Sequence, residues 1–348
     1  MTTNTHDYAS AGVSIDAGDA LVQEIKRITR PQKSPFLLGG IGGFGGLFAL
    51  PPGYREPVLV ASTDGVGTKL KLAFATGVHD TIGWDLVAMS VNDILVCGAR
   101  PLFFLDYFAT GRLEVPVAAK VVQGIYDACA SCGVVLLGGE TAELPGFYQA
   151  GEYDLAGFAV GVVDRANLPD AGRVRAGDVV IALPSSGLHS NGYSLARKVL
   201  LEVLGLAVDA PWDDTGRTVG QELLTPTRIY VNQVLPLIEA GLVQSMVHVT
   251  GGGLIENPPR SVPPGLGMDL EPSAWPLPAV FERIRDAGVA PLELARTFNC
   301  GLGFLMVVHP GDEGAVCARL TEMGETFHRV GAISPRPGED RSTRMGWT

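Results

Sequence analysis

The sequence predicts a mixed α/β protein built from two domains. Strand-like apolar runs alternate with helix-like segments in both halves of the chain, a pattern typical of α/β architectures. The chain has 348 residues, and at roughly 100–200 residues per domain this length favours two domains. Hydrophobic residues make up 46% and charged residues 18% of the chain, a balance that suits a packed core and excludes an intrinsically disordered protein.

The first half is expected to begin with a loose polar arm over residues 1–20. Short apolar runs rich in β-branched residues then predict strands, and longer apolar-periodic segments predict helices. In order, we expect a helix over 20–28, a strand over 57–62, a helix starting at 69–74, a helix over 84–97, a strand over 102–109, a helix over 115–132, and strands over 134–137 and 156–163.

A charged stretch with Pro and Gly, residues 164–178, marks the expected domain boundary. We place the division between 170 and 171, so that the domains cover 1–170 and 171–348. In the second domain we expect a strand over 179–183, helices over 194–204 and 228–240, strands over 247–249 and 268–270, a helix over 278–286, a strand over 302–308, a helix over 313–323 and a strand over 327–333.

Charge and cysteine content narrow the class of protein. The chain carries 26 basic and 37 acidic residues, a net charge of −11. Non-specific nucleic-acid binding needs a surplus of Lys and Arg, so nucleic acid is not an expected partner. No run of about 18 apolar residues occurs, so no membrane span is expected. An odd number of cysteines and a polar N-terminus favour a reduced, cytoplasmic enzyme, with Cys129 and Cys132 as core thiols rather than zinc ligands.

Glycine is enriched and clustered. The chain contains 45 glycines, about 13% against an average near 7%. They gather in short runs after apolar segments, of which GGIGGFGG at 39–46 is the longest and predicts a flexible loop. Such turns allow the backbone to approach a ligand closely.

The run DGVGTK at 64–69 follows a predicted strand and opens a predicted helix. Its glycines and the helix N-terminus could turn backbone N–H groups toward an anion, and Lys69 could contact a phosphate. Asp64 suits Mg²⁺, which prefers carboxylates together with substrate phosphates. The pattern is not a Walker A motif, and a polar loop with a helix cap is the alternative.

Two further carboxylates could complete an acidic site. Asp93 lies beside Asn92 in the predicted helix 84–97, and Glu140 follows the predicted buried strand 134–137. A buried carboxylate is unfavourable by several kcal/mol unless it is paired or binds a metal. With Asp64, these residues could hold Mg²⁺ on a nucleotide. The alternatives are a solvent-facing Asp93 and an exposed Glu140 on a glycine turn.

Two turns of the second half are rich in small polar residues. SSGLHSNGY at 185–193 contains His189, which could act as a general acid or base or bind phosphate. TGGG at 250–253 offers backbone N–H groups to an oxyanion. The alternatives are a capping loop with a simply hydrogen-bonded His189, and a flexible linker. A Ser–His nucleophile is disfavoured because the G-x-S-x-G elbow is absent.

These motifs occur in a fixed order along the chain. They are DGVGTK (64–69), DLVAMSVND (85–93), PLFFLDYFATG (101–111), GGETAELP (138–145), SSGLHSNGYSL (185–195), LTPTRIYV (224–231), TGGGLIEN (250–257) and RTFNCGLG (296–303). In this order they closely resemble the phosphoribosylformylglycinamidine cyclo-ligases, the AIR synthetase family of de novo purine biosynthesis, from about residue 11 to residue 333.

The resemblance implies a homodimer in which the N-terminal domains pair their sheets into a barrel, each subunit also having a C-terminal α/β domain. It implies ATP, Mg²⁺ and often a monovalent cation such as K⁺. The implied reaction converts formylglycinamidine ribonucleotide and ATP into aminoimidazole ribonucleotide, ADP and phosphate. The γ-phosphoryl group would pass to the formyl oxygen before the ring closes.

The resemblance also implies roles for residues at matching positions. The catalytic residues would be Asp64, Lys69, Asp93 and His189, and the metal ligands Asp64, Asp93 and Glu140. The nucleotide would contact Lys26, Gly42, Gly43, Gly45, Gly46, Gly65, Gly67, Thr68, Lys69 and Glu140. The substrate would contact Ser190, Asn191, Thr250, Gly251, Gly252 and Gly253.

Two other functions are compatible with parts of the sequence. Formylglycinamidine synthetase, selenophosphate synthetase, hydrogenase-maturation and thiamine-phosphate kinases would share the two-domain fold and the acidic set. The runs at 185–195, 226–231 and 296–303 favour the cyclo-ligase over these enzymes. A non-catalytic nucleotide-binding protein would be expected to lack part of the set Asp64, Lys69, Asp93 and Glu140, and all four are present.

Overall fold

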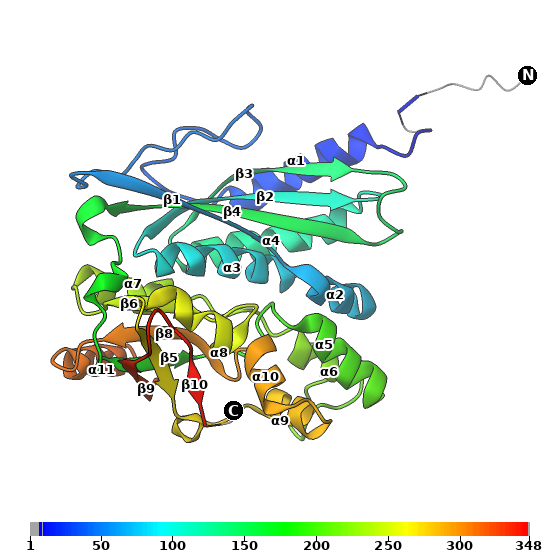
Figure 1. Cartoon of the computed structure of the whole chain (residues 1–348). Coiled ribbons are helices and arrows are strands. Elements are labelled where there is room, and N and C mark those ends of the chain that lie inside the picture. The colour runs from blue at the N-terminus through cyan, green and yellow to red at the C-terminus, as the bar shows by residue number, and fades with distance from the viewer. Residues whose placement is uncertain (1–6, 9, 347–348) are drawn as a thin grey trace, which may run out of the picture.

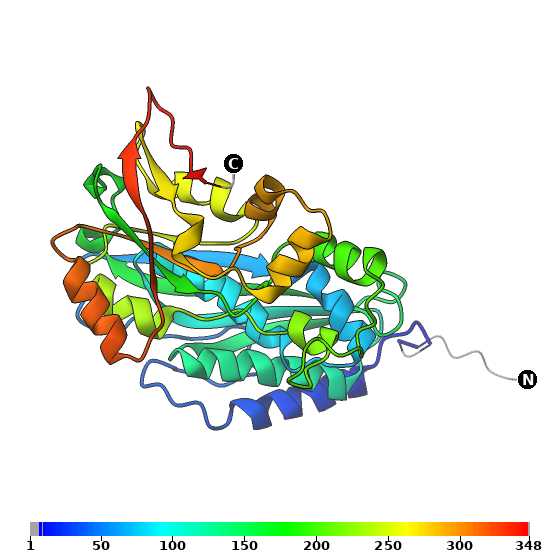
Figure 2. The ribbon, with the colours of Figure 1, turned by 90° about the horizontal axis from the view of Figure 1, so that it is seen from below.

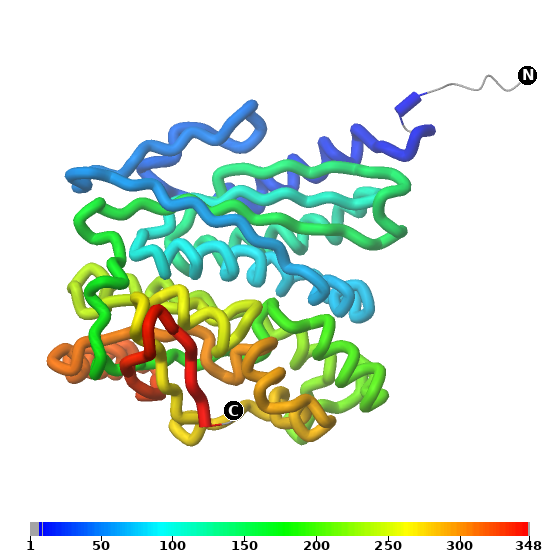
Figure 3. Tube along the Cα trace, viewed as in Figure 1, coloured from blue at the N-terminus to red at the C-terminus, as the bar shows by residue number. Residues whose placement is uncertain are grey.

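Two β-sheets, each formed by one half of the chain, organise the molecule (Figure 1). The structure is a computed structural model and describes residues 7, 8 and 10–346. The first part of the expected polar arm, residues 1–6 and 9, lies outside the described residues. The chain passes from one layer to the other through residues 165–178, at one end of the sheets (Figure 3).

The first sheet has four strands in the order β1-β4-β2-β3. Its strands are β1 (Pro57–Gly65), β2 (Arg100–Thr110), β3 (Val135–Glu143) and β4 (Tyr153–Asp164). β4 pairs antiparallel with β1 and β2, and β2 pairs parallel with β3. All four expected strands are present. However, β1 and β3 continue into their polar runs, so Asp64 and Glu140 lie within strands rather than on turns.

Helices cover one face of this sheet. They are α1 (Ile15–Thr29), α3 (Ile82–Val96) and α4 (Val115–Ser131), with α2 (Leu70–Thr76) following the 3₁₀ turn η1 (Gly67–Lys69). α1 lies along α4 (Figure 2), and α3 lies between the sheet and the second domain. α1 begins earlier than expected because Ser14 caps it, accepting the Ala17 N–H at 3.1 Å.

The opposite face of the first sheet is open and partly apolar. Leu59 on β1 and Phe158 on β4 point to this side and expose 64% and 44% of their surface. Residues of β1 alternate between exposed and partly buried along its first eight positions, as expected for a sheet with one covered face.

The second sheet has six strands in the order β10-β7-β9-β5-β8-β6. They are β5 (Val179–Pro184), β6 (Ser245–His248), β7 (Leu266–Leu270), β8 (Leu302–Val308), β9 (His328–Pro335) and β10 (Arg344–Met345). All neighbours are antiparallel except β10 and β7. The mixed α/β class is therefore confirmed, with mostly antiparallel pairing, and β10 is a strand that the sequence did not predict.

Short helices surround the second sheet. They are α5 (Tyr193–Arg197), which continues as the π-helical turn η4 (Lys198–Val203), then α6 (Val219–Leu223), α7 (Val231–Glu239), α8 (Gly253–Glu256), α9 (Ala279–Asp286), α10 (Pro291–Thr297) and α11 (Glu313–Glu322). α10 was not predicted, and α7 begins three residues later than expected. None of these helices, or of the others in the described part of the chain, is long and apolar enough to cross a bilayer. Cys129 and Cys132 are free and buried, which confirms them as core thiols.

Candidate active site between the two domains

A cavity of about 560 Å³ lies where the two domains meet. We call it the interdomain cavity. The first domain contributes β1 and the end of α3, and the second contributes β6 with the turn that follows it. Its polar lining includes Ser62, Asp93, His248, Thr250, Asn257 and Arg260. Asp93 and Thr250 were expected at the site from the sequence, and the structure brings them to the same cavity.

Asp64 lies on β1, close to this cavity. Its side chain shares the face of the sheet that the helices cover, and its Oδ1 accepts the Gly65 N–H at 2.7 Å. Burial raises the pKa of Asp64, the Gly65 hydrogen bond opposes this shift, and the neighbouring Asp93 charge raises the pKa further. Two carboxylates that repel each other in this way are suited to share a divalent cation.

His248 is a site residue that sequence analysis missed. It is buried at the end of β6, and its Nδ1 lies 2.9 Å from Asp93 Oδ1. Asn92 sets the tautomer: its Oδ1 accepts the Tyr230 N–H at 3.0 Å, so its Nδ2 is the atom that donates to Arg228 O and faces His248 Nε2 at 3.4 Å. Nε2 is then the acceptor and Nδ1 carries the proton toward Asp93.

A signal for His248 was present in the sequence. It is a polar residue near the end of a short apolar strand, two residues before the TGGG turn, which is the position where α/β ligand sites gather. Glu140 also follows an apolar strand, but the structure places it away from this cavity.

Glu140 does not join Asp64 and Asp93 within one chain. Asp64 shares its row across the sheet with Gly157, Asp106 and Gly139, while Glu140 shares the next row with Tyr107. Successive residues of a strand point to opposite faces, so Glu140 faces the open side of the sheet. It is also three strands away, about 14 Å at the usual strand spacing.

One chain therefore does not bring the three expected carboxylates together, and the full set stays a prediction. No group of three or more His, Cys, Asp or Glu side chains that could hold a metal occurs among the described residues. Asp64 and Asp93 remain together, and they fit a Mg²⁺ ion whose other ligands come from water and from substrate phosphates.

Lys69 does not point into an open site. Its side chain is fully buried, and its Nζ lies 2.7 Å from Asp85 Oδ2, 2.9 Å from His189 O and 2.8 Å from Thr225 O. Two carbonyl oxygens thus accept hydrogen bonds from the ammonium group, and the Asp85 carboxylate pairs with its charge. η1 turns the Lys69 side chain inward, toward the second domain, so its phosphate contact stays a prediction that this structure does not show.

His189 is also fully buried, as in the alternative of a simply hydrogen-bonded residue, and its role in catalysis or phosphate binding stays a prediction. Its Nε2 accepts the Ser186 N–H at 3.2 Å, and its Nδ1 has no hydrogen-bond partner among the described residues. Burial lowers the pKa of His189 well below its usual range, and the nearby His248, Lys69 and Arg228 add to this shift. The imidazole is neutral and lines neither the interdomain cavity nor the smaller cavity described next.

The two polar turns of the second domain meet. A Cβ built on Gly251 would lie 3.7 Å from Asn191 Oδ1. Asn257 fixes the TGGG turn, because its Oδ1 accepts the Thr250 N–H at 2.8 Å and its Nδ2 donates to Gly251 O at 3.0 Å. Beside the turn is a second cavity of about 330 Å³, lined by Gly192, Gly251, Gly252, Glu256, Glu293, Arg296 and Thr297.

Lys26 and the glycine loop form a separate group. A Cβ on Gly42 would lie 3.5 Å from Lys26 Nζ, and one on Gly46 would lie 2.4 Å from Leu137 of β3. Gly43 and Gly45 are exposed on the loop between them. This group therefore lies at the β3 edge of the first sheet, whereas Asp64, Gly65 and the exposed Gly67 and Thr68 lie at the β1 edge.

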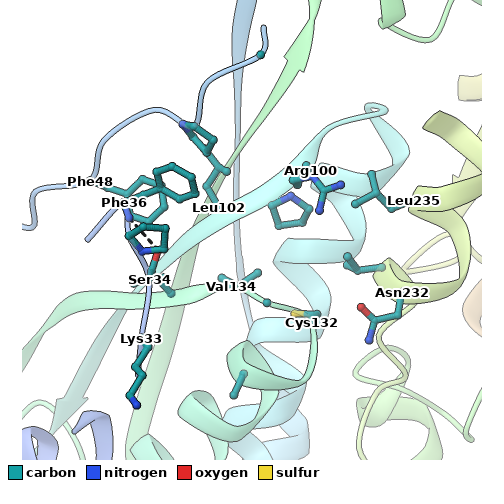
Figure 4. A pocket seen from close by; sticks show the side chains of 18 of the residues that line it. Lys33, Ser34, Phe36, Phe48, Arg100, Leu102, Cys132, Val134, Asn232 and Leu235 are labelled. Atoms are coloured by element: carbon teal, nitrogen blue, oxygen red, sulfur yellow. Dashed lines mark hydrogen bonds between the residues drawn. The ribbon is translucent and has the colours of Figure 1, made fainter. Parts of the chain in front are cut away.

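A larger groove of about 1020 Å³ lies elsewhere, between the loop that carries Ser34 and Phe36 and the helix α7 (Figure 4). Phe36, Phe48 and Leu102 form one wall, and Asn232 and Leu235 of α7 form another. None of the residues expected at the site lines this groove. Size alone therefore does not identify the functional cavity.

Comparison with known protein families defines the class of this protein. Residues 52–163 match the model for the N-terminal domain of AIR synthase related proteins, and residues 175–342 match the model for their C-terminal domain. Both halves of the chain are thus those of an AIR synthase related protein.

Curated relatives identify the family within this class. The chain is 58% identical to phosphoribosylformylglycinamidine cyclo-ligase of Anaeromyxobacter dehalogenans over 95% of the chain and 97% of the relative. It is 56% identical to the protein of that name from Myxococcus xanthus, with the same coverage. It is 53% identical to that from Burkholderia vietnamiensis, over 95% and 94%. The chain belongs to the phosphoribosylformylglycinamidine cyclo-ligase family, as the motifs indicated.

Solved structures support the fold. Thiamine-monophosphate kinase from Stenotrophomonas maltophilia superposes with a TM-score of 0.68 at 19% identity, covering 94% of this chain and 96% of that one. The hydrogenase maturation protein HypE, solved in complex with ATP, superposes with a TM-score of 0.65 at 20% identity, covering 97% and 94%. At this identity the likeness concerns the fold alone.

Proposed function

We infer that the chain closes the imidazole ring of aminoimidazole ribonucleotide from formylglycinamidine ribonucleotide, using ATP, in de novo purine biosynthesis. The observation that carries this conclusion is the 53–58% identity to phosphoribosylformylglycinamidine cyclo-ligases over 95% of the chain. The neighbouring carboxylates of Asp64 and Asp93 at the domain junction supply the acidic groups that a nucleotide-using enzyme needs.

The reaction needs an activated formyl group. A bond forms between the γ-phosphorus of ATP and the formyl oxygen, the bond to the β-phosphate oxygen breaks, and ADP leaves. A nitrogen of the same molecule then attacks the formyl carbon, loses a proton, and expels the oxygen as inorganic phosphate. Because the second step is intramolecular, holding the substrate in a folded conformation supplies much of its rate.

Asp64 and Asp93 would hold Mg²⁺ on the polyphosphate. Bound there, the ion would neutralise charge on the transferring phosphoryl group. His248 occupies Asp93 Oδ1 at 2.9 Å, which fixes the rotamer of the carboxylate and leaves Oδ2 for the ion. The Tyr230 N–H fixes the Asn92 side chain, and Asn92 in turn fixes the ring of His248. The K⁺ requirement that the resemblance implies stays a prediction.

The substrate would bind in the second domain. Asn191, next to Ser190, lies beside Gly251, and Gly251 lines the small cavity together with Arg296, whose Nε pairs with Glu256 at 2.5 Å. Backbone N–H groups of a glycine turn and a guanidinium group suit the phosphate of a ribonucleotide. Gly253 contributes through packing instead, because a Cβ there would lie 2.1 Å from Ala295 O.

The active form would be a homodimer joined through the open face of the first sheet. Leu59 and Phe158 expose apolar surface there, and a second copy would cover it and close a barrel. Pairing would also bring the β3-edge group of one copy, Lys26, the glycine loop and Glu140, toward the β1-edge group of the other. This arrangement gives Glu140 a role at the nucleotide that it lacks within one chain.

Two smaller expectations complete the proposal. The domain division at 170/171 is supported by the position of the sheets, since the first ends at Asp164 and the second begins at Val179. A cytoplasmic location is supported by the substrates, because ATP and a phosphorylated ribonucleotide do not cross membranes unaided.

One assay tests the function. Purified protein is supplied with ATP, Mg²⁺ and formylglycinamidine ribonucleotide, and ADP and the diazotisable aminoimidazole are measured together. The proposal predicts equal amounts of both products. ADP without aminoimidazole would indicate a kinase-like activity on another acceptor, and a folded protein that forms neither product would favour a binding protein.

A further inference from the structure

Lys69 is buried in a closed set of oxygen atoms at the domain junction. It belongs to the first domain, and its Nζ pairs with Asp85 Oδ2 of α3 in the same domain at 2.7 Å. Its other two partners, His189 O and Thr225 O, belong to the second domain, at 2.9 and 2.8 Å. The exposed fraction of both charged side chains is 0%, so solvent does not weaken these contacts.

Asp85 reaches across the junction as well. Its Oδ1 accepts hydrogen bonds from the Thr227 N–H at 2.8 Å and from the Thr227 hydroxyl at 2.6 Å. Each member of the ion pair thus holds the second domain directly. Lys69 contacts the backbone carbonyl groups of His189 and Thr225, and Asp85 contacts the backbone N–H and the hydroxyl group of Thr227.

The loop held by Lys69 has an unfavourable backbone conformation. His189 has a φ of +62°, in the left-handed region that residues other than glycine seldom adopt, and such a conformation persists only where surrounding contacts fix it. Ser190, the next residue, donates its hydroxyl proton to Val66 O at 3.0 Å. The loop that carries Ser190 and Asn191 is thereby tied to the segment that follows Asp64.

We propose that the Lys69–Asp85 ion pair is a positioning device, which holds the Ser190–Asn191 loop of the second domain in register with Asp64 of the first. Lys69 acts through the loop backbone and does not bind the nucleotide. A buried ion pair is weak support for stability, because apolar or neutral groups of similar size often replace it without loss. The ion pair matters here because it fixes the carbonyl groups of His189 and Thr225.

The test compares single and double variants. Lys69→Met leaves Asp85 buried without its partner, so its Tm should fall by several degrees. The double variant Lys69→Met/Asp85→Asn carries no buried charge and keeps an acceptor for Thr227, so its Tm should recover most of this loss, the remainder reflecting the two carbonyl groups that Lys69 no longer contacts. Lys71→Met is the matched control: this lysine is exposed and pairs with Glu152, and its variant should keep wild-type kinetics.

Kinetics of the double variant separate positioning from a structural role. We expect KM for formylglycinamidine ribonucleotide to rise and kcat/KM to fall by about 100-fold, the usual consequence of misplacing a reacting group by about 1 Å. We expect Kd for ATP, measured without the ribonucleotide, to stay within about twofold. Wild-type kinetics with a restored Tm would overturn the proposal, and so would a tenfold or greater loss of ATP affinity.

A milder variant covers the case in which the double variant does not fold. Thr227→Val removes one hydrogen bond to Asp85 and leaves the ion pair in place, so KM for the ribonucleotide should rise severalfold with ATP affinity unchanged. An unchanged KM would overturn the proposal. The inference rests on the proposed function, but the two fail differently: absence of aminoimidazole from the wild type would refute the function, whereas Tm and ATP affinity still test the ion pair.

Discussion

Asp93 is held by a defined partner yet stays accessible. His248 Nδ1 contacts its Oδ1, and 44% of its side chain is exposed. Asp93→Asn should keep the acceptor for His248 and leave Tm unchanged, while kcat falls by about 100-fold or more because the proposed Mg²⁺ would lose a charged ligand. Steady-state kinetics at saturating Mg²⁺ and a thermal melt measure both effects. An unchanged kcat would remove Asp93 from the metal site.

The buried carboxyl group of Asp106 should make the free energy of unfolding depend on pH. It lies on β2 on the helix-facing side of the sheet, between Gly139 and Gly157, and burial raises its pKa from 3.8 to about 7. The folded protein therefore holds this proton up to higher pH than the unfolded chain. The group has no effect on stability below about pH 4, and it lowers stability progressively from about pH 4 to pH 7.

Asp106→Asn should abolish this loss. Its free energy of unfolding should match that of the wild type near pH 4 and exceed it above pH 7, by on the order of 4 kcal/mol. Denaturant titrations at pH 4, 6 and 8 measure the difference. Parallel pH profiles for the two proteins would show that Asp106 titrates normally.

At the scale of elements, the TGGG turn contains glycines with different tasks. Gly253 has a φ of +54°, and a Cβ there would lie 2.1 Å from Ala295 O, whereas the nearest atom to a Cβ on Gly251 is 3.7 Å away. Gly253→Ala should lower Tm by several degrees because backbone must move, and Gly251→Ala should leave Tm nearly unchanged. Equal melting temperatures for the two variants would contradict this assignment of roles.

Most strands were predictable because short apolar, β-branched runs specify them directly. The expected runs at 57–62, 102–109 and 302–308 lie wholly within β1, β2 and β8. The polar ends were harder, since Asp64 and Glu140 follow apolar residues but remain paired in the sheet. α10 and β10 were missed because each is short and stabilised by its neighbours rather than by a local pattern.

At the scale of the whole molecule, the open face of the first sheet predicts a dimer. Leu59→Glu and Phe158→Glu should each yield monomers with much reduced activity, because a buried carboxylate without a partner is strongly unfavourable in an interface. Val203→Glu is the control, since Val203 exposes 62% of its surface on η4 in the second domain. Sedimentation velocity measures the oligomeric state. Dimers in all three variants would place the interface elsewhere.

Only part of the site could be predicted from the sequence, because the rest depends on how strands pair and how the two domains dock. The order of the motifs indicated the family. It also indicated Asp64 and Asp93 as site residues, because both follow from residue type and position in the sequence. Lys69 and His189 are buried because the two domains dock against each other. Glu140 points to the open face of the sheet because of the strand register. Neither feature is encoded in a local sequence pattern. His248 could have been found from its position at the end of a strand.

Phosphorylation of the formyl oxygen before ring closure is the step on which the proposed reaction depends. It is tested by supplying formylglycinamidine ribonucleotide labelled with ¹⁸O in the formyl group and analysing the inorganic phosphate by mass spectrometry. We expect one ¹⁸O atom in the phosphate for each aminoimidazole formed. Unlabelled phosphate, with the label in water instead, would contradict it, because ATP would then be hydrolysed without activating the substrate.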